Sequence, residues 1–199
     1  ALNVFARLYD EPGTPADQAR LPAVHSRELV SVLERFSLAA QRLGDLQGGY
    51  FSLEMWNETS GQKDETIRRA TGYVASPADF VLSGPHFYAG NPISKTPKRV
   101  CETHKAYDNV DLTTIPSDYL PRSNYVPACD VATYASRVPH VSWVDDGEKA
   151  PKPVTAYYRL AARAMISTGA EKGLVASIIP KHISHTNGVR SYVFRSSQD

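Results

Sequence analysis

Proline is the feature that most constrains this chain, because nine of its 14 prolines are spread through one segment, from Ser83 to Pro153. Proline lacks a backbone donor and has a fixed φ, so it breaks helix interiors and central strands. The segment is therefore predicted to form short strands and loops. It also carries large side chains that are unfavourable in water, which indicates ordered, functional loops on a scaffold. These residues are Phe87, Tyr88, Tyr107, Leu112, Tyr119, Tyr125 and Trp143.

Two segments outside this region have helical character. Leu29, Leu33, Phe36, Ala40 and Leu43 repeat at intervals of three and four, which predicts an amphipathic helix over residues 26–43. Ser26 is placed as its N-cap, and Gly44 as its C-terminal stop. A second helix is predicted through YYRLAARAMIS, where Thr155 is the cap, Arg159 and Arg163 form a basic i,i+4 pair, and Gly169 ends the helix.

Short strands are predicted from β-branched and aromatic runs over residues 71–75, 80–82, 173–179 and 189–194. The fold class predicted from these elements is α+β. It has an N-terminal amphipathic helix, a mixed or antiparallel sheet of short strands with long Pro-rich loops, and a C-terminal helix–strand pair. The predicted domains are residues 1–49, which contain the helix, and residues 50–199.

The composition is that of an ordinary globular protein, with 42% hydrophobic and 22% charged residues in 199. No apolar run approaches the roughly 18 residues of a membrane span, and the opening ALNVFARLYDEPG lacks the pattern of a signal peptide. We therefore expect a cytoplasmic protein without a membrane partner. Cys101 and Cys129 have no CxxC spacing, which favours reduced structural thiols over a disulfide.

The charge is nearly neutral overall but alternates along the chain. Residues 1–60 and 101–150 carry net charges of −3 and −4, whereas residues 61–100 and 151–199 carry +3 and +5. If the two basic blocks share a surface, they form a local positive face of the kind that contacts phosphates. The alternative is ordinary patchiness without a binding role.

Basic and amide side chains gather in turn-rich segments, which is the composition of a DNA-reading surface. Phosphate contacts are predicted at Arg68, Arg69, Lys95, Lys98 and Arg99, and groove-reading contacts at Asn91, Lys181, His182 and Asn187. Arg122 and Arg190 complete the candidate DNA-binding set. The competing interpretation is that Arg68, Arg122 and Arg190 are structural, and either pair with acids such as Asp64 or Asp118 or donate to loop carbonyls.

The known motifs of catalysis are missing from the sequence. It has no GxGxxG, GxxxxGK[ST], GxSxG or HExxH, and Asn91-Pro92-Ile93 lacks the second proline and the aromatic residue of an NPPY motif. We therefore predict no catalytic residue. His182 and His185 have a spacing that favours hydrogen-bonding loop histidines over a metal site. A metal-dependent hydrolase that uses these two histidines is kept as an alternative.

Three stretches carry a resemblance to a known family: SGPHFYAGNPISKTPKRVC from Ser83, YDNVDLTTIPSDYLPRSNYVPACD from Tyr107, and YYRLAARAM followed by GLVASIIPKHISHTNGV. A fourth stretch, WNETSGQKDETIRRAT, precedes these three in the chain and carries the same resemblance. Over residues 50–194 the chain resembles the C-terminal part of bacterial restriction-modification enzymes. These are S-adenosylmethionine-dependent adenine-N6 DNA methyltransferases of the type II fused kind, together with related phage-defence methyltransferases.

In such enzymes a methyltransferase core holds the cofactor and the catalytic motif, and a following region recognises the DNA sequence. The resemblance implies that this chain is the target recognition domain, without cofactor or catalytic residues of its own. Its implied partners are double-stranded DNA and the catalytic domain of the same parent chain. The parent is then a site-specific DNA methyltransferase, with or without endonuclease activity.

Residues and resemblance together predict sequence-specific binding of duplex DNA. The main alternative is a protein-docking module, in which Tyr88, Tyr107 and Trp143 pack on a partner and the lysines matter less. The two hypotheses differ in salt dependence, because only phosphate contacts release condensed counterions.

Overall fold

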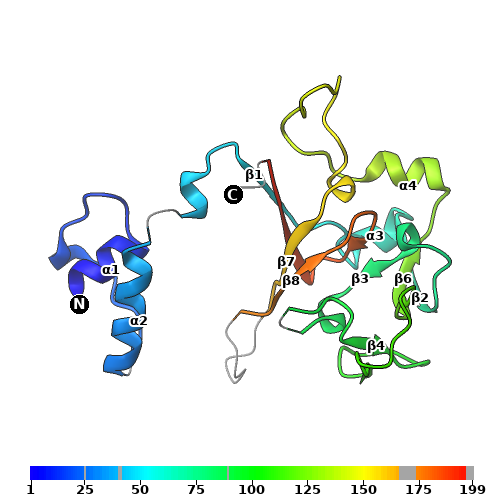
Figure 1. Cartoon of the computed structure of the whole chain (residues 1–199), viewed down its shortest axis with the longest axis horizontal. Helices are drawn as coiled ribbons and strands as arrows, with labels where there is room; N and C mark the ends of the chain where they lie inside the picture. Colours follow the sequence, from blue (N-terminus) through cyan, green and yellow to red (C-terminus); the bar gives the residue numbers. More distant parts are fainter. Residues whose placement is uncertain (25, 40–41, 89, 166–173, 196–199) are drawn as a thin grey trace. The chain divides into compact units, whose positions relative to one another are not determined.

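The computed structural model describes residues 1–24, 26–39, 42–88, 90–165 and 174–195. The chain forms two compact units, Ala1–Gln47 and Gly48–Asp199 (Figure 1). None of the helices in the described ranges is long and apolar enough to cross a membrane.

The first unit consists of helices and turns. Helix α1 (Leu2–Tyr9) packs against helix α2 (Arg27–Ser37), and Phe5 and Ala6 are the buried apolar residues of α1. The predicted N-cap is confirmed, since the Ser26 hydroxyl accepts a hydrogen bond from the Leu29 amide at 3.1 Å. Two short 3-10 turns, Ala16–Gln18 and Leu43–Asp45, complete the unit.

The predicted helix over residues 26–43 is too long at its C-terminal end. Helix α2 stops at Ser37, because the Leu38 amide donates to the Arg35 carbonyl and the Ala39 amide to the Phe36 carbonyl, which closes the last turn. Leu43, which extended the apolar periodicity, begins a separate 3-10 turn in which the Asp45 carboxylate accepts from the Arg42 amide at 2.8 Å. The predicted stripe position Ala40 lies outside the described residues.

The second unit is built on a four-stranded antiparallel sheet, ordered β1-β10-β7-β8. Its strands are β1 (Tyr50–Leu53), β10 (Val189–Phe194), β7 (Arg159–Arg163) and β8 (Ala176–Ile179). Burial alternates along β10, β8 and the first half of β7, as it does in a sheet with one covered face. Ala161, Ile179 and Val193 face the core, whereas Leu160 and Ile178, which are partners in the β7–β8 register, are exposed.

The predicted C-terminal helix is wrong. Thr155 lies in a 3-10 turn, Val154–Ala156, and the basic pair Arg159 and Arg163 marks the two ends of strand β7. Arg, Leu and Ala favour helices, but pairing with β10 and β8 on both sides outweighs this local propensity. The predicted continuation to Gly169 lies outside the described residues. The C-terminal pair is therefore strand with strand, and the α+β class holds because N-terminal helices are followed by a mainly antiparallel set of strands.

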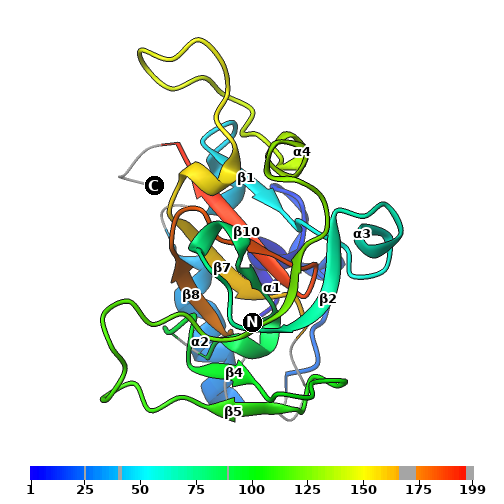
Figure 2. The same cartoon turned by 90° about the vertical axis from the view of Figure 1, so that its right-hand side faces the viewer.

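The described residues of this unit also form three two-stranded sheets. β2 (Ile67–Gly72) pairs antiparallel with β6 (Ser123–Pro127), and β4 (Lys95–Pro97) pairs antiparallel with β5 (Tyr107–Asn109). β3 (Val81–Leu82) runs parallel to β9 (Ser184–His185). Figure 2 shows β4 and β5 side by side. The remaining elements are helices α3 (Ser60–Lys63) and α4 (Val131–Arg137), and the 3-10 turns Pro77–Asp79 and Gly84–His86.

The described residues of the Pro-rich segment form short strands and turns, as predicted, and also one helix that the sequence did not predict. Helix α4 fits between Pro127 and Pro139, and the Asp130 carboxylate caps it by accepting from the amides of Ala132 and Thr133 at 3.0 Å. The strand predicted over residues 189–194 is confirmed as β10, whereas the one predicted over 71–75 is shifted, since β2 ends at Gly72.

Candidate nucleic-acid interface

A nine-residue connection between β4 and β5, Lys98–Ala106, forms an exposed basic loop. It is held against β2, because the Arg69 guanidinium donates to the Cys101 carbonyl. Cys101 itself is buried, and the Lys98 amide donates to the Ala106 carbonyl at 2.9 Å, which closes the loop at its base. The basic loop is therefore a fixed projection from the second unit.

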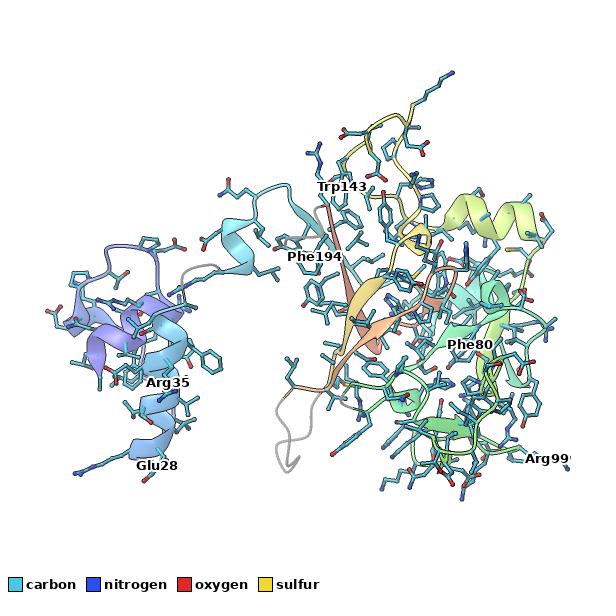
Figure 3. The ribbon with its side chains drawn as sticks, viewed as in Figure 1. Glu28, Arg35, Phe80, Arg99, Trp143 and Phe194 are labelled. Carbon is cyan, nitrogen blue, oxygen red and sulfur yellow. The ribbon has the colours of Figure 1, made fainter. Side chains whose placement is uncertain are left out.

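Several cations of this region lack an acidic partner within the described residues. Arg99 and Lys105 are exposed on the basic loop, and Lys95 is half-buried on β4. Figure 3 shows Arg99 at the outer edge of this region. Lys98 lies 3.7 Å from the Asp108 carboxylate, but both side chains are 54% exposed. Such a pair contributes little in water, so a phosphate can displace the carboxylate.

Arg122 is structural, as the competing interpretation of the sequence held. Its Nε donates to the Pro97 carbonyl at 2.7 Å, and its backbone amide donates to the Thr96 hydroxyl at 3.0 Å. The guanidinium lies over the Tyr73 ring, 5.5 Å from its centroid. Arg122 therefore fixes β4, which carries one end of the basic loop.

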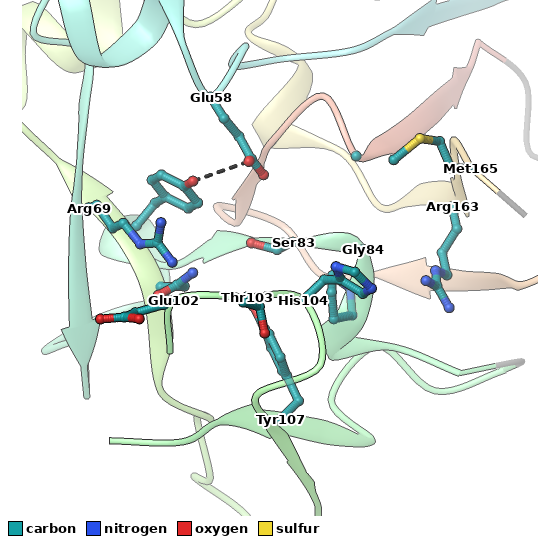
Figure 4. Close-up of a pocket in the computed structure, with 14 residues that line it drawn as sticks. Glu58, Arg69, Ser83, Gly84, Glu102, Thr103, His104, Tyr107, Arg163 and Met165 are labelled. Carbon is teal, nitrogen blue, oxygen red and sulfur yellow. Dashed lines mark hydrogen bonds between the residues drawn. The ribbon is translucent and has the colours of Figure 1, made fainter. Parts of the chain in front are cut away.

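A cavity of about 690 Å³ lies beneath the basic loop, and Arg69 is the one predicted site residue that lines it (Figure 4). Glu102, Thr103 and His104 of the loop line it from one side. Glu58, Tyr107, Asn124, Tyr125 and Arg163 supply its other polar and aromatic groups.

The polar groups of this cavity are fixed by neighbours. The Tyr125 hydroxyl donates to Glu58 Oε2 at 3.1 Å. Burial, and then the Glu58 charge, raise the pKa of Tyr125 to about 12, so the phenol stays protonated and keeps donating. Burial likewise raises the pKa of Tyr107. The cavity thus presents a preorganised carboxylate and neutral phenols.

The remaining predicted residues do not join this surface. Arg68 is exposed and lines a different pocket together with His182, because neighbouring residues on strand β2 point to opposite faces. Arg190 pairs with Glu54 at 2.6 Å on the outer face of the large sheet. Lys181 lies over the Tyr158 ring, 5.5 Å from its centroid.

The two predicted groove-reading asparagines are occupied within the fold. Asn91 Oδ1 accepts from the Ile93 amide at 2.8 Å, which makes a local turn. Asn187 Oδ1 accepts from the Glu58 amide at 3.1 Å, so Asn187 braces the backbone that carries the pocket carboxylate. The predicted site residues therefore fall into three groups: those on the basic loop or its cavity, those at the second pocket, and those that hold the fold together.

The two histidines of the hydrolase alternative do not form a ligand pair. His182 is exposed, with a φ of 71°, whereas His185 is fully buried and uses both ring nitrogens. His185 Nδ1 donates to the Thr186 carbonyl at 3.0 Å, and Nε2 accepts from the Ser191 hydroxyl at 2.8 Å. Burial lowers the pKa of His185 to about 3. Within the described ranges, no group of three or more His, Cys, Asp or Glu side chains is placed to hold a metal ion.

The three aromatic residues of the docking alternative lie in three different environments. Trp143 is buried, and its indole donates to Asp145 at 3.1 Å. Tyr107 packs edge-on against His86, with 5.3 Å between the ring centroids. Tyr88 is half-exposed. These side chains therefore do not form one apolar surface.

Sequence reasoning did not single out Glu58, Lys105 or Arg163 as binding residues. Arg163 was noted only as part of a basic pair on a predicted helix, and Lys105 follows His104 in a segment with two acids nearby. Glu58 carries no local signal, since its relevance comes from the cavity. Asn124 lies in YLPRSNY, one of the turn-rich segments with basic and amide side chains.

Comparison of the chain with protein-family models, curated proteins and solved structures finds no match. The interface is therefore interpreted from its own geometry and charge.

Proposed function

We propose that this chain binds duplex DNA through the basic loop, with Lys95, Arg99 and Lys105 as phosphate contacts. The observation that carries the proposal is that these three cations lack acidic partners within the described residues and lie on one anchored strand–loop–strand element. An unpaired cation on a rigid projection pays little ordering entropy on meeting a phosphate. Lys98 is a fourth contact once Asp108 is displaced.

The resemblance supplies the biological context of this proposal. The chain acts as the target recognition domain of an adenine-N6 DNA methyltransferase, and S-adenosylmethionine and the catalytic groups belong to the rest of the parent enzyme. Phosphate contacts position such a domain, and contacts to base edges give it sequence preference. We assign no catalytic role to the residues described above.

The test is fluorescence-anisotropy binding to a labelled random-sequence duplex at several salt concentrations between about 50 and 200 mM. Each phosphate contact contributes about −0.9 to the slope of log K against log salt, so three or four contacts give a slope of about −3. The double variant Arg99→Ala/Lys105→Ala should lose about two units of this slope. Selection from a random pool then measures sequence preference.

Lys149→Ala, which removes one exposed cation from the connection between α4 and the Val154–Ala156 turn, is the matched control and should leave the slope unchanged. A shallow slope for the unmodified protein, or one that the double variant does not alter, contradicts the proposal.

A second function, protein docking, is favoured by the outer face of the large sheet. Tyr158, Leu160, Leu174 and Ile178 are all exposed on or beside β7 and β8, and exposed apolar patches of this kind mark protein interfaces. We propose that this face receives the catalytic domain of the parent chain. Ile178→Ser should weaken association with that domain, expressed separately, and leave the DNA salt slope unchanged. Loss of DNA binding in Ile178→Ser contradicts this division of roles.

A further inference from the structure

The cavity beneath the basic loop has a hydrogen-bond acceptor that is fixed and still available. Glu58 Oε2 is held by the Tyr125 hydroxyl, whereas Oε1 has no hydrogen-bond partner within the described residues. The Glu58 backbone is fixed too, since its amide donates to Asn187. The carboxylate therefore presents one free oxygen from a preorganised position at the cavity wall (Figure 4).

A hydrogen-bond donor lines the same cavity. Asn124 is buried, and its Oδ1 accepts from the Thr71 hydroxyl at 2.7 Å. The orientation set by this bond leaves the Nδ2 amide hydrogens of Asn124 without a partner in the described ranges. Arg69 adds donors at this end, because its bond to the Cys101 carbonyl uses only part of the guanidinium.

The walls supply rings and, at the opposite end in Figure 4, a second cation. His104 and Tyr107 line the cavity, and aromatic side chains are the surfaces on which bases stack. Arg163 has no acidic partner within the described residues and lies close to Gly84, where an added Cβ would come within 3.7 Å of its Nε. The tight contact at Gly84 is with the backbone, since an added Cβ would lie 3.0 Å from the Gly188 carbonyl oxygen, so glycine permits two backbone segments to approach closely beside Arg163.

We infer that this cavity binds a nucleotide, with the base between Glu58 and Asn124 and the phosphate at Arg163. The Watson–Crick edge of every nucleobase places a donor beside an acceptor, which a free carboxylate oxygen and an amide N–H complement. A volume of about 690 Å³ is within the range of small-molecule sites. The base comes either from an unstacked nucleotide of bound DNA, in which case the inference rests on the proposed function, or from a free mononucleotide.

The first arm of the test compares three labelled duplexes: fully paired, with one bulged nucleotide, and with the same bulge made abasic. A bulged base has already lost its pairing, so little energy is spent in unstacking it. The base-bearing bulge should bind about tenfold more tightly than the abasic bulge. Anisotropy at one low salt concentration measures all three.

Glu58→Gln tests the assigned acceptor. If the Tyr125 hydroxyl donates to the amide oxygen, the new NH₂ group faces the base where a carboxylate oxygen stood, so most of the tenfold preference should disappear. Affinity for the paired duplex should not change. Glu148→Gln is the matched control, because Glu148 pairs with Lys152 at 2.8 Å outside the cavity and should retain the full preference.

Arg163→Gln tests the phosphate end independently of Glu58. It should weaken both bulged duplexes equally, since the abasic site keeps its phosphate, and so preserve the ratio between them. Thermal unfolding followed by circular dichroism identifies a variant that has lost its fold. A variant that has lost its fold also loses affinity for the paired duplex. In that case the remaining one of Glu58→Gln and Arg163→Gln tests the inference.

The second arm titrates the four deoxynucleoside monophosphates into the protein by calorimetry. Binding that Glu58→Gln removes supports the inference with a free nucleotide as the ligand, whereas a bulge preference supports it with DNA as the source. Equal affinity for all three duplexes and no mononucleotide binding overturn the inference and leave the proposed function intact. If no duplex binds in a salt-dependent way, the proposed function is overturned instead. The mononucleotide titration then shows whether the cavity binds a nucleotide.

Discussion

The buried histidines and the basic loop place basic side chains in two opposite environments, one inside the fold and one exposed to solvent. His86 and His185 are fully buried, and each uses both ring nitrogens in hydrogen bonds to the surrounding fold. Arg99 and Lys105 on the basic loop are exposed and lack an acidic partner in the part of the chain described. Burial and bonding therefore separate residues that hold the fold from residues that are available to a ligand.

The largest expected effect comes from pH acting on the buried pair. An unfolded histidine binds a proton near pH 6.5, whereas burial lowers the pKa of His86 to about 4 and that of His185 to about 3. The unfolded state therefore binds more protons below pH 6.5, and stability is lost as the pH falls through this window. The loss should be about 1.4 kcal/mol per pH unit for each histidine, or about 5 kcal/mol between pH 6.5 and pH 4.5.

Urea unfolding at a series of pH values measures this dependence. In His185→Asn the slope between pH 6.5 and pH 4.5 should fall to about half, because one of the two groups is gone. A free energy of unfolding that stays constant across this window contradicts the assignment of both histidines as buried and neutral.

Truncation of one buried ring has the next largest effect. His185→Ala leaves a cavity and removes the partners of the Ser191 hydroxyl and the Thr186 carbonyl, so it should lower the free energy of unfolding by about 2–4 kcal/mol. His104→Ala, on the exposed basic loop, should change it by less than about 0.5 kcal/mol. Equal effects in urea unfolding would remove the distinction between the two regions.

Two arginines sharpen the comparison within the predicted site. Arg122→Ala removes the bond to the Pro97 carbonyl and the contact with Tyr73, and should cost about 1–2 kcal/mol of stability. Arg99→Ala should leave stability unchanged, lower duplex affinity about three- to tenfold at low salt, and flatten the salt slope by about 0.9.

Urea unfolding and anisotropy on the same preparations separate the two roles. If Arg122→Ala flattens the salt slope as much as Arg99→Ala does, then Arg122 contacts DNA directly and its bracing role is secondary.

Elements with strong local signals were predictable from the sequence. Ser26 caps α2 because its hydroxyl reaches the Leu29 amide, and the alternating VRSYVF forms β10. By contrast, Arg159–Arg163 has helix-favouring residues and becomes a strand because β10 and β8 lie on either side of it. Local propensity is weak when long-range pairing supplies hydrogen bonds to both edges of a segment.

The candidate site was predictable in part for the same reason. The sequence identifies basic loops, but not that Arg122 bonds to Pro97 or that Arg190 pairs with Glu54, more than a hundred positions away. The cavity draws Glu58, Asn124 and Arg163 together from distant segments, so no motif spacing describes it. The fold determines which cations lack an acidic partner, so composition alone cannot identify them.

The smallest expected effect concerns the one ion pair between the basic loop and β5 that the described residues show. Lys98 and Asp108 are 3.7 Å apart and equally exposed, so their attraction contributes under about 1 kcal/mol to stability. Asp108→Asn removes a negative charge that opposes an approaching phosphate and frees Lys98 to meet it. Duplex affinity should rise two- to threefold at about 50 mM salt, and the gain should shrink at about 200 mM because salt screens exposed charges. Asp146→Asn, which removes an exposed acid elsewhere, should not change affinity. If Asp108→Asn binds no more tightly than the unmodified protein at low salt, the duplex does not approach Lys98, and the phosphate contacts reduce to Lys95, Arg99 and Lys105.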